Sequence, residues 1–265
     1  MTDRSAPDPA SVVFDCHFHV IDPAFPLVPN DGYLPPFFPV GEYLAEMSAL
    51  GLGVAGGVVV TASFQGTDTA YLRAALSSLG PSWRAVIPFD PAIGDGDIAT
   101  LNALGVRAMR LNIRRGGAFD IAELDRTARR IWDQAGWHME FYLGAEALEN
   151  LRPALMQLPK VAIDHLGLSD RAVPHLLVLA ARGTGIKATG FARFDGDPLR
   201  ALRRLHSENP TTLMFGSDLP STRAPRRFGS TDLLIIGEAF GASDRQGPME
   251  VNGARFYGVQ LGDRP

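Results

Sequence analysis

Two histidines lie two residues apart near the start of the chain, in the run Asp15-Cys16-His17-Phe18-His19. If this run is a β-strand, alternation places His17 and His19 on one face together with Asp15, and turns Cys16 and Phe18 to the other face. Two imidazoles on one face of a strand can bind one metal ion or polarise a carbonyl group together. The pattern therefore marks a candidate site at the end of this strand.

Two further apolar runs end in residues of the same kinds. One ends Ile163-Asp164-His165, and the other ends Phe215-Gly216-Ser217-Asp218. An unpaired carboxylate is costly next to an apolar run, so we expect Asp218 to have either a partner or a function. The alternative is that Asp218 caps the segment that follows.

The elements that must position these residues alternate along the whole chain. Eight short apolar runs are typical of strands, and they cover residues 12–19, 57–63, 84–89, 106–113, 138–143, 160–165, 186–190 and 212–217. Amphipathic stretches lie between them, and the clearest one places Ile121, Leu124, Ala128, Ile131, Trp132 and Ala135 on one face. Further helices are expected over residues 71–79, 147–158, 173–182 and 199–206.

Strict alternation of strands and helices predicts an α/β fold with a parallel sheet, and eight units predict a closed (β/α)8 TIM barrel. The alternative, an open doubly wound sheet, lacks the Gly-rich phosphate loop expected after the first strand, where residues 21–39 are rich in proline and aromatics. We predict a single domain over residues 12–265, preceded by a flexible tail over residues 1–11. In such a barrel the ends of the first, sixth and eighth strands meet at one mouth.

Composition narrows the function. The 265 residues carry 25 Lys+Arg against 29 Asp+Glu, a formal net charge of −4, so neither nucleic acid nor an anionic membrane is expected as a partner. The single cysteine, Cys16, cannot form an internal disulfide. Together with the absence of a signal-peptide pattern, it favours a cytoplasmic location. A homodimer is left open.

The motifs together resemble the amidohydrolase-related hydrolases of the amidohydrolase superfamily. The resemblance rests on His17-x-His19, on Asp164-His165-Leu166-Gly167, on Gly216-Ser217-Asp218-Leu219-Pro220 and on the closing residues 252–258. Within that family the chain is most similar to the branch that holds the 2-pyrone-4,6-dicarboxylate lactonases. The matching segments there are residues 110–115, Phe141-Tyr142 and residues 187–193. Residues 221–225 depart from the branch, which has a Trp-Pro-His type sequence at that place.

The resemblance implies a hydrolase that opens a small anionic lactone. Asp218 would activate water, while His17, His19 and His165 would polarise the carbonyl. The substrate carboxylates would be bound by a set of side chains that consists of Arg110, Arg114, Arg115, Tyr142, Arg193 and Ser63, with Arg223 as an extension. The guanidinium fork fits a carboxylate with two parallel hydrogen bonds, which supports this assignment independently. The alternatives are a sugar-lactone or sulfomuconolactone hydrolase, and a metal-dependent non-oxidative decarboxylase.

Metal dependence is a separate question. Two-metal members of the superfamily commonly use a carboxylated lysine on the fourth strand and a histidine on the fifth. The only lysines are Lys160 and Lys187, and His138 begins the fifth strand, where a structural role is expected. A two-metal centre is therefore not expected. The lactonase branch that the chain resembles works without a metal, so the resemblance, together with the missing fifth-strand histidine, implies that no metal is required. One divalent cation, Zn or Mn, held by His17, His19, His165 and Asp218 is the alternative.

Overall fold

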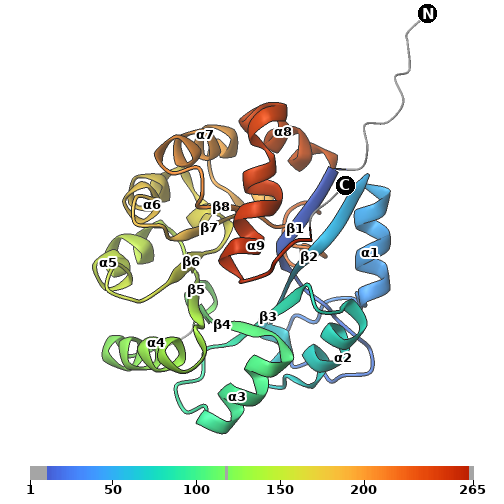
Figure 1. Ribbon diagram of the computed structural model, residues 1–265, viewed down its shortest axis with the longest axis vertical. Coiled ribbons are helices and arrows are strands. Elements are labelled where there is room, and N and C mark those ends of the chain that lie inside the picture. The colour runs from blue at the N-terminus through green and yellow to red at the C-terminus, as the bar shows by residue number, and fades with distance from the viewer. Residues whose placement is uncertain (1–10, 117–118, 263–265) are drawn as a thin grey trace, which may run out of the picture.

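The computed structural model describes residues 11–116 and 119–262. Eight parallel strands, paired in the order β1 to β8, form a barrel that is surrounded by helices (Figure 1). The strands are β1 (Ser11–Phe18), β2 (Leu52–Val60), β3 (Trp83–Pro88), β4 (Val106–Asn112), β5 (His138–Tyr142), β6 (Val161–Ile163), β7 (Gly185–Ala188) and β8 (Leu213–Phe215). The helices are α1 (Val40–Ala49), α2 (Ala70–Leu79), α3 (Asp95–Leu104), α4 (Ile121–Ala135), α5 (Ala145–Leu155), α6 (Val173–Ala180), α7 (Pro198–Glu208), α8 (Ser230–Asp244) and α9 (Asn252–Phe256).

The predicted (β/α)8 barrel is thus confirmed, and all eight predicted strands are present. The predicted tail, residues 1–11, lies outside the described residues except for Ser11, which begins β1. Helix α4 shows the expected end signals: Asp120 caps its first turn by accepting a hydrogen bond from the Glu123 amide at 2.8 Å, and Gly136 ends it in the left-handed region. Among the described residues, no helix is long and apolar enough to cross a membrane.

The helix predictions were incomplete, and one detail was wrong. Helices α1, α3, α8 and α9 were not among the predicted helices. On α4, Leu124 and Ile131 are buried as expected, but Ile121 and Trp132 are exposed. The buried face of α4, formed by Leu124, Thr127, Ala128 and Ile131, is therefore narrower than the predicted apolar stripe.

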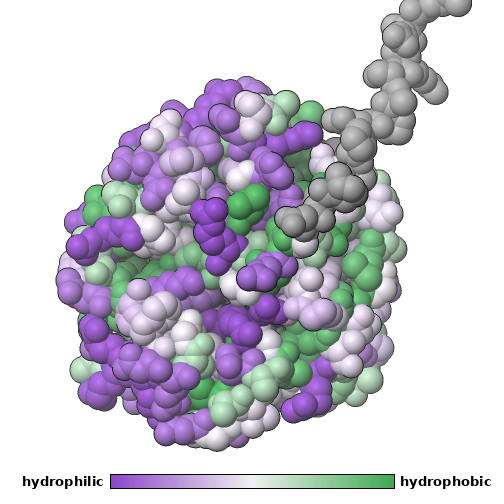
Figure 2. Space-filling model, viewed as in Figure 1, coloured by the Kyte–Doolittle hydropathy of each residue, from purple (hydrophilic) through white to green (hydrophobic). Residues whose placement is uncertain are grey.

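Apolar side chains fill the inside of the barrel, and the amino ends of the strands are covered by the end of the chain. Phe14, Cys16, Val58 and Val60 belong to this inner cluster together with residues of α9. At this covered end the Asn252 amide donates to the Leu213 carbonyl at 2.9 Å. Figure 1 is viewed with α9 in front of the strands, and Figure 2 shows that hydrophobic residues on this face form separate patches between hydrophilic ones.

Closure between the first and last strands brings two parts of the site together. The Asp218 amide donates to the His17 carbonyl and the His19 amide donates to the Leu219 carbonyl, both at 2.7 Å. The Asp15 carboxylate supports this seam, because it accepts hydrogen bonds from the Ser217 amide and hydroxyl at 3.0 and 2.6 Å. The backbone that closes the barrel is therefore the same backbone that carries the candidate catalytic residues.

The prediction that Asp15 shares a face with His17 and His19 was wrong. Asp15 accepts a hydrogen bond at 3.0 Å from Tyr43 on α1, on the outer side of the barrel, and Cys16 lies in the inner cluster. The pairing of β1 with β2 is irregular between Asp15 and Phe18, which breaks the simple alternation of side chains. Asp15 is thus part of the seam and not of the site.

Candidate active site

Three imidazoles surround one carboxylate oxygen at the carboxyl end of the barrel. Asp218 Oδ1 lies 3.7 Å from His17 Nε2, 3.6 Å from His19 Nε2 and 3.9 Å from His165 Nε2. All four residues are buried. The structure therefore brings together the four residues that the sequence analysis singled out for catalysis.

Two of these residues have an unusual backbone. His165 and Asp218 have positive φ angles of 52° and 59°, although neither is a glycine. His165 begins a short 3-10 turn directly after β6, and Asp218 follows β8 by three residues. Left-handed conformations in non-glycine residues cluster at functional sites, where surrounding contacts hold them.

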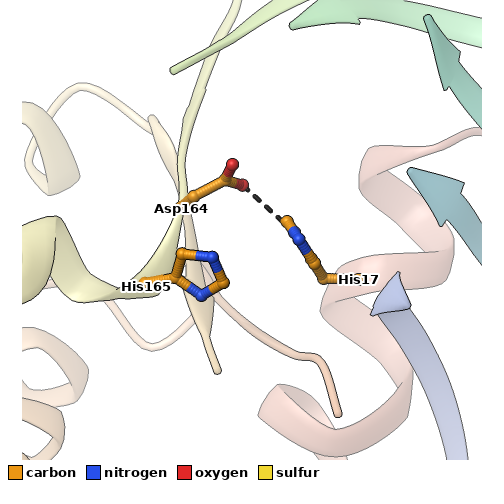
Figure 3. A group of neighbouring side chains, drawn as sticks. All are labelled: His17, Asp164 and His165. Carbon is orange, nitrogen blue, oxygen red and sulfur yellow. Dashed lines mark ion pairs between the residues drawn. The ribbon is translucent and has the colours of Figure 1, made fainter. Parts of the chain in front are cut away.

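Asp164 joins this group from the end of β6. Its Oδ1 lies 3.3 Å from His17 Nδ1, and Figure 3 marks this ion pair and shows His165 beside it. Its Oδ2 accepts a 2.7 Å hydrogen bond from Arg110 Nε. Asp164 therefore occupies the side of His17 that faces away from Asp218.

A buried charge network that the sequence analysis missed lies beneath the imidazoles. The Lys187 ammonium lies 2.6 Å from Glu140 Oε2 and 3.3 Å from both Asp164 Oδ1 and His17 Nδ1. His138 Nε2 lies 3.1 Å from Glu140 Oε1 at the far end of the network, consistent with the structural role expected for His138. A signal was available: Glu140 and Lys187 are charged residues inside short strands, where both faces are normally apolar.

Burial and these charges set the protonation states. Burial lowers the pKa of His17 from its ordinary 6.5 to about 4, and it lowers the pKa of His165 well below its usual range. Burial alone would raise the pKa of Asp218, but His165, the guanidinium of Arg193 and the neighbouring His19 and His17 together hold it well below the ordinary value. The site near neutral pH therefore combines an ionised Asp218 with neutral His17 and His165.

The predicted substrate-binding arginines fall into three groups. Arg110 and Arg193 are already engaged: Arg110 with Asp164, and Arg193 with Asp218 Oδ2 through Nε and Nη2 at 2.9 and 2.7 Å. Arg114 and Arg115 lie in a 3-10 turn after β4 and point into the mouth of the barrel. Arg223 lies over the ring of Tyr33, 4.5 Å from its centroid, and donates to the Asn30 carbonyl.

Two cavities sharing part of their lining lead from the mouth to the carboxylate. The outer one measures about 630 Å³, and its lining includes Arg114 and Arg171. The inner one, of about 40 Å³, reaches His19, His165 and Asp218 and is also lined by Ser63. The two have in common the residues Arg115, Tyr142, Arg193 and Arg223. A ligand at Asp218 would thus be surrounded by guanidinium groups on its outer side.

The donor set fits one divalent cation but not two. His19 Nδ1 lies 2.7 Å from the Val60 carbonyl, which only accepts, so the lone pair of His19 is on Nε2 and faces Asp218. His17 Nε2 is buried without a hydrogen-bond partner among the described residues, and potential ligand atoms of His17, His19 and Asp218 lie within 4.8 Å of one another. These three, with His165, would hold the ion, which would act as a Lewis acid. A second ion would need a bridging lysine on β4 and a histidine at the end of β5. β4 carries arginine instead, and β5 ends in Tyr142.

Comparison with known proteins gives this geometry a context. A family model described as Amidohydrolase matches residues 14–259. A 2-pyrone-4,6-dicarboxylate hydrolase of Comamonas testosteroni is 35% identical over 169 residues, a match that spans 61% of this chain and 53% of that relative. A 4-sulfomuconolactone hydrolase of Hydrogenophaga intermedia is 26% identical over 84% of this chain and 81% of its own length.

Solved structures agree with the family match. A Pseudomonas putida structure, described as a candidate 2-pyrone-4,6-dicarboxylic acid hydrolase, superposes with a TM-score of 0.81. It is 28% identical, and the match covers 96% of this chain and 100% of that one. Because the family model covers nearly the whole barrel, including the segments that carry His17, His165 and Asp218, the chain belongs to the amidohydrolase family.

Proposed function

We propose that this amidohydrolase opens a lactone that carries carboxylate groups, of the 2-pyrone-4,6-dicarboxylate type. The observation that carries the proposal is an ionised Asp218 among three imidazoles. Asp218 lines the inner cavity, and the outer cavity that shares part of its lining holds five arginines. Relatives named as hydrolases of 2-pyrone-4,6-dicarboxylate and of 4-sulfomuconolactone support hydrolysis of a cyclic ester.

The chemical step needs only water and the lactone. Asp218 Oδ1 takes a proton from water as the water oxygen bonds to the carbonyl carbon. An imidazole N–H stabilises the negative charge that develops on the carbonyl oxygen. The bond between this carbon and the ring oxygen then breaks, and Asp218 returns the proton to the leaving oxygen. The products are the ring-opened acid and a regenerated carboxylate.

The arginines that form no ion pair with a carboxylate of the protein are the best candidates to bind the carboxylates of the substrate. Arg114 and Arg115 lie at the mouth, and Arg115 reaches both cavities. Arg115→Gln is expected to raise KM about tenfold or more with kcat changed less than about threefold, because the lost contact serves binding and not the reacting bond. An unchanged KM would remove Arg115 from the substrate-binding set.

We propose further that no metal is required. Three buried carboxylates in and below the site are matched by three buried or nearly buried cations. The carboxylates are Glu140, Asp164 and Asp218, and the cations are Arg110, Lys187 and Arg193. The group is therefore already neutral, whereas a bound divalent ion would add two uncompensated positive charges in a low-dielectric interior.

The first experiment is turnover of 2-pyrone-4,6-dicarboxylate by the purified protein with a chelator present, followed as loss of pyrone absorbance. Robust turnover is the expected result. Turnover that appears only after Zn or Mn is added would overturn the proposal that no metal is required. The imidazoles would then be metal ligands. If no turnover occurs in either condition, and the protein with metal releases carbon dioxide from an aromatic acid, the proposed reaction would be decarboxylation and not hydrolysis.

A sulfonated muconolactone is the second candidate substrate. It is favoured by the relative from Hydrogenophaga intermedia, whose match covers most of both chains. A sulfonate would use the same guanidinium donors as a carboxylate. Measuring kcat/KM for both lactones in parallel ranks the two candidates directly.

A further inference from the structure

His17 and His19 face the same carboxylate oxygen, but their other nitrogens meet different groups. His19 Nδ1 meets the Val60 carbonyl at 2.7 Å, so it carries the proton and leaves a lone pair on Nε2. His17 Nδ1 meets the Lys187 ammonium at 3.3 Å. An ammonium has three donors and no lone pair, so this hydrogen bond requires Nδ1 of His17 to accept.

The only competing partner of His17 Nδ1 within the described part of the chain is Asp164 Oδ1, also at 3.3 Å. This contact lacks the alignment of a hydrogen bond, since Asp164 Oδ1 has no hydrogen-bond partner among the described residues. The other oxygen of Asp164 is held by Arg110, which fixes the carboxylate in this orientation. The geometry therefore favours Lys187 as the donor over Asp164 as the acceptor.

We infer that Lys187 is a positioning residue that places the proton of neutral His17 on Nε2, so that His17 donates to the carbonyl oxygen of the substrate while His19 can only accept. Lys187 is completely buried, and its 2.6 Å ion pair with Glu140 keeps it in place as an ammonium. Its role explains why His17 Nε2 is buried and without a partner in the structure: it is a donor aimed at a group that arrives with the substrate. In its catalytic part the inference rests on the proposed lactone hydrolysis, whereas the two tautomers can be measured without any substrate.

The direct test is nitrogen NMR of protein labelled with 15N in its histidine rings. Couplings between ring protons and ring nitrogens identify which nitrogen carries the proton, and single His17→Gln and His19→Gln variants assign the signals. The expected result is the Nε2–H form for His17 and the Nδ1–H form for His19 at pH 7. An Nδ1–H form for His17 would overturn the inference whatever the substrate proves to be.

The functional test exchanges the ion pair for two neutral residues in Glu140→Gln/Lys187→Met, which leaves the net charge of the interior unchanged. Without the ammonium, His17 Nδ1 is expected to take the proton and donate to Asp164, and Nε2 becomes a lone pair. Loss of a donor to the developing oxyanion predicts a fall in kcat of about 100-fold with KM changed less than about twofold. Retention of the Nε2–H form, or of full kcat, in a folded double variant would contradict the role of Lys187.

A matched control variant and a second measurement distinguish a positioning role of Lys187 from a general disturbance of the buried charge network. Tyr257→Phe removes a different partner of Glu140 and leaves Lys187 in contact with His17, so it should keep both tautomer and kcat. The double variant should also bind Co²⁺ at least about tenfold more tightly than the unaltered protein in calorimetry, because its His17 Nε2 lone pair would face those of His19 and Asp218. Unchanged Co²⁺ binding would count against the tautomer switch. Should the double variant not fold, the NMR assignment on the unaltered protein decides the question.

Discussion

At the residue scale, Asp218 is the group on which the proposed chemistry depends. Its two oxygens have separate roles: Arg193 holds Oδ2 with two hydrogen bonds, and Oδ1 faces the imidazoles. Asp218→Asn keeps the shape and lets the amide oxygen accept from Arg193, but an amide cannot take a proton from water. We expect turnover to fall by at least about 1000-fold, while the affinity for a non-hydrolysed dicarboxylate analogue, measured by calorimetry, changes little. Retained turnover would remove Asp218 from its role as base.

The pH dependence of activity also belongs to this scale. In the proposed mechanism His17 must be neutral to be oriented by Lys187. Burial lowers the pKa of His17 to about 4, and the pKa of Asp218 is lower still. We therefore expect kcat/KM to be constant from about pH 6 to pH 8 and to fall only as the pH approaches 4, where His17 gains a proton. If kcat/KM instead falls around pH 6.5, the ordinary pKa of imidazole, the histidine that controls the rate does not have the lowered pKa of buried His17.

At the scale of the elements, the turn after β7 positions His165. Gly190 has φ +65°, and a Cβ atom there would lie 2.6 Å from His165 Nδ1. Gly190→Ala is expected to displace this imidazole and lower kcat at least about tenfold, besides the cost of about 1 kcal/mol for a left-handed alanine. Gly183→Ala is the matched control, because Gly183 has φ +83° but nothing within 4 Å of an added Cβ. Thermal unfolding should report a loss of stability in both variants, and only the first should lose activity; equal activities would mean that the close contact with His165 has no consequence.

The elements also show how far sequence reasoning extends. Alternating apolar runs with caps such as Asp120 and Gly136 were enough to predict the barrel, and the barrel alone places His17, His165 and Asp218 at one mouth. Asp15 was misplaced because the irregular pairing of β1 with β2 depends on contacts that local alternation does not contain. The partners of Lys187 come from β1, β5 and β6, so only the closed barrel reveals them.

At the scale of the whole molecule, a chain of buried charges crosses the otherwise apolar interior of the barrel between its two ends. The carboxyl end holds the site, and α9 with its neighbours covers the amino end. Between them, Lys187 and Glu140 form a path of buried charges from His17 to His138 and Tyr257. A charged path through an apolar core has a desolvation cost that only complete pairing offsets. The stability of the molecule should therefore depend on pH through residues far from the substrate.

His138 allows this dependence to be measured away from the site. Burial lowers its pKa from 6.5 to about 4, so as the pH falls from 6.5 the unfolded chain takes up a proton that the folded protein does not. This contribution to stability is complete above pH 6.5 and is lost progressively down to about pH 4. The raised pKa of Asp15, about 6, acts in the opposite direction, because the folded protein then holds the extra proton.

His138→Gln should leave the Asp15 contribution in place. It should make the free energy of unfolding depend less steeply on pH, by up to about 1.4 kcal/mol per pH unit near pH 5. Denaturant unfolding of both proteins from pH 4.5 to 7.5 measures the two slopes, and the comparison does not depend on how much His138→Gln lowers stability overall. Parallel slopes would mean that His138 titrates normally in the folded protein, and hence that the covered end of the barrel admits water to it.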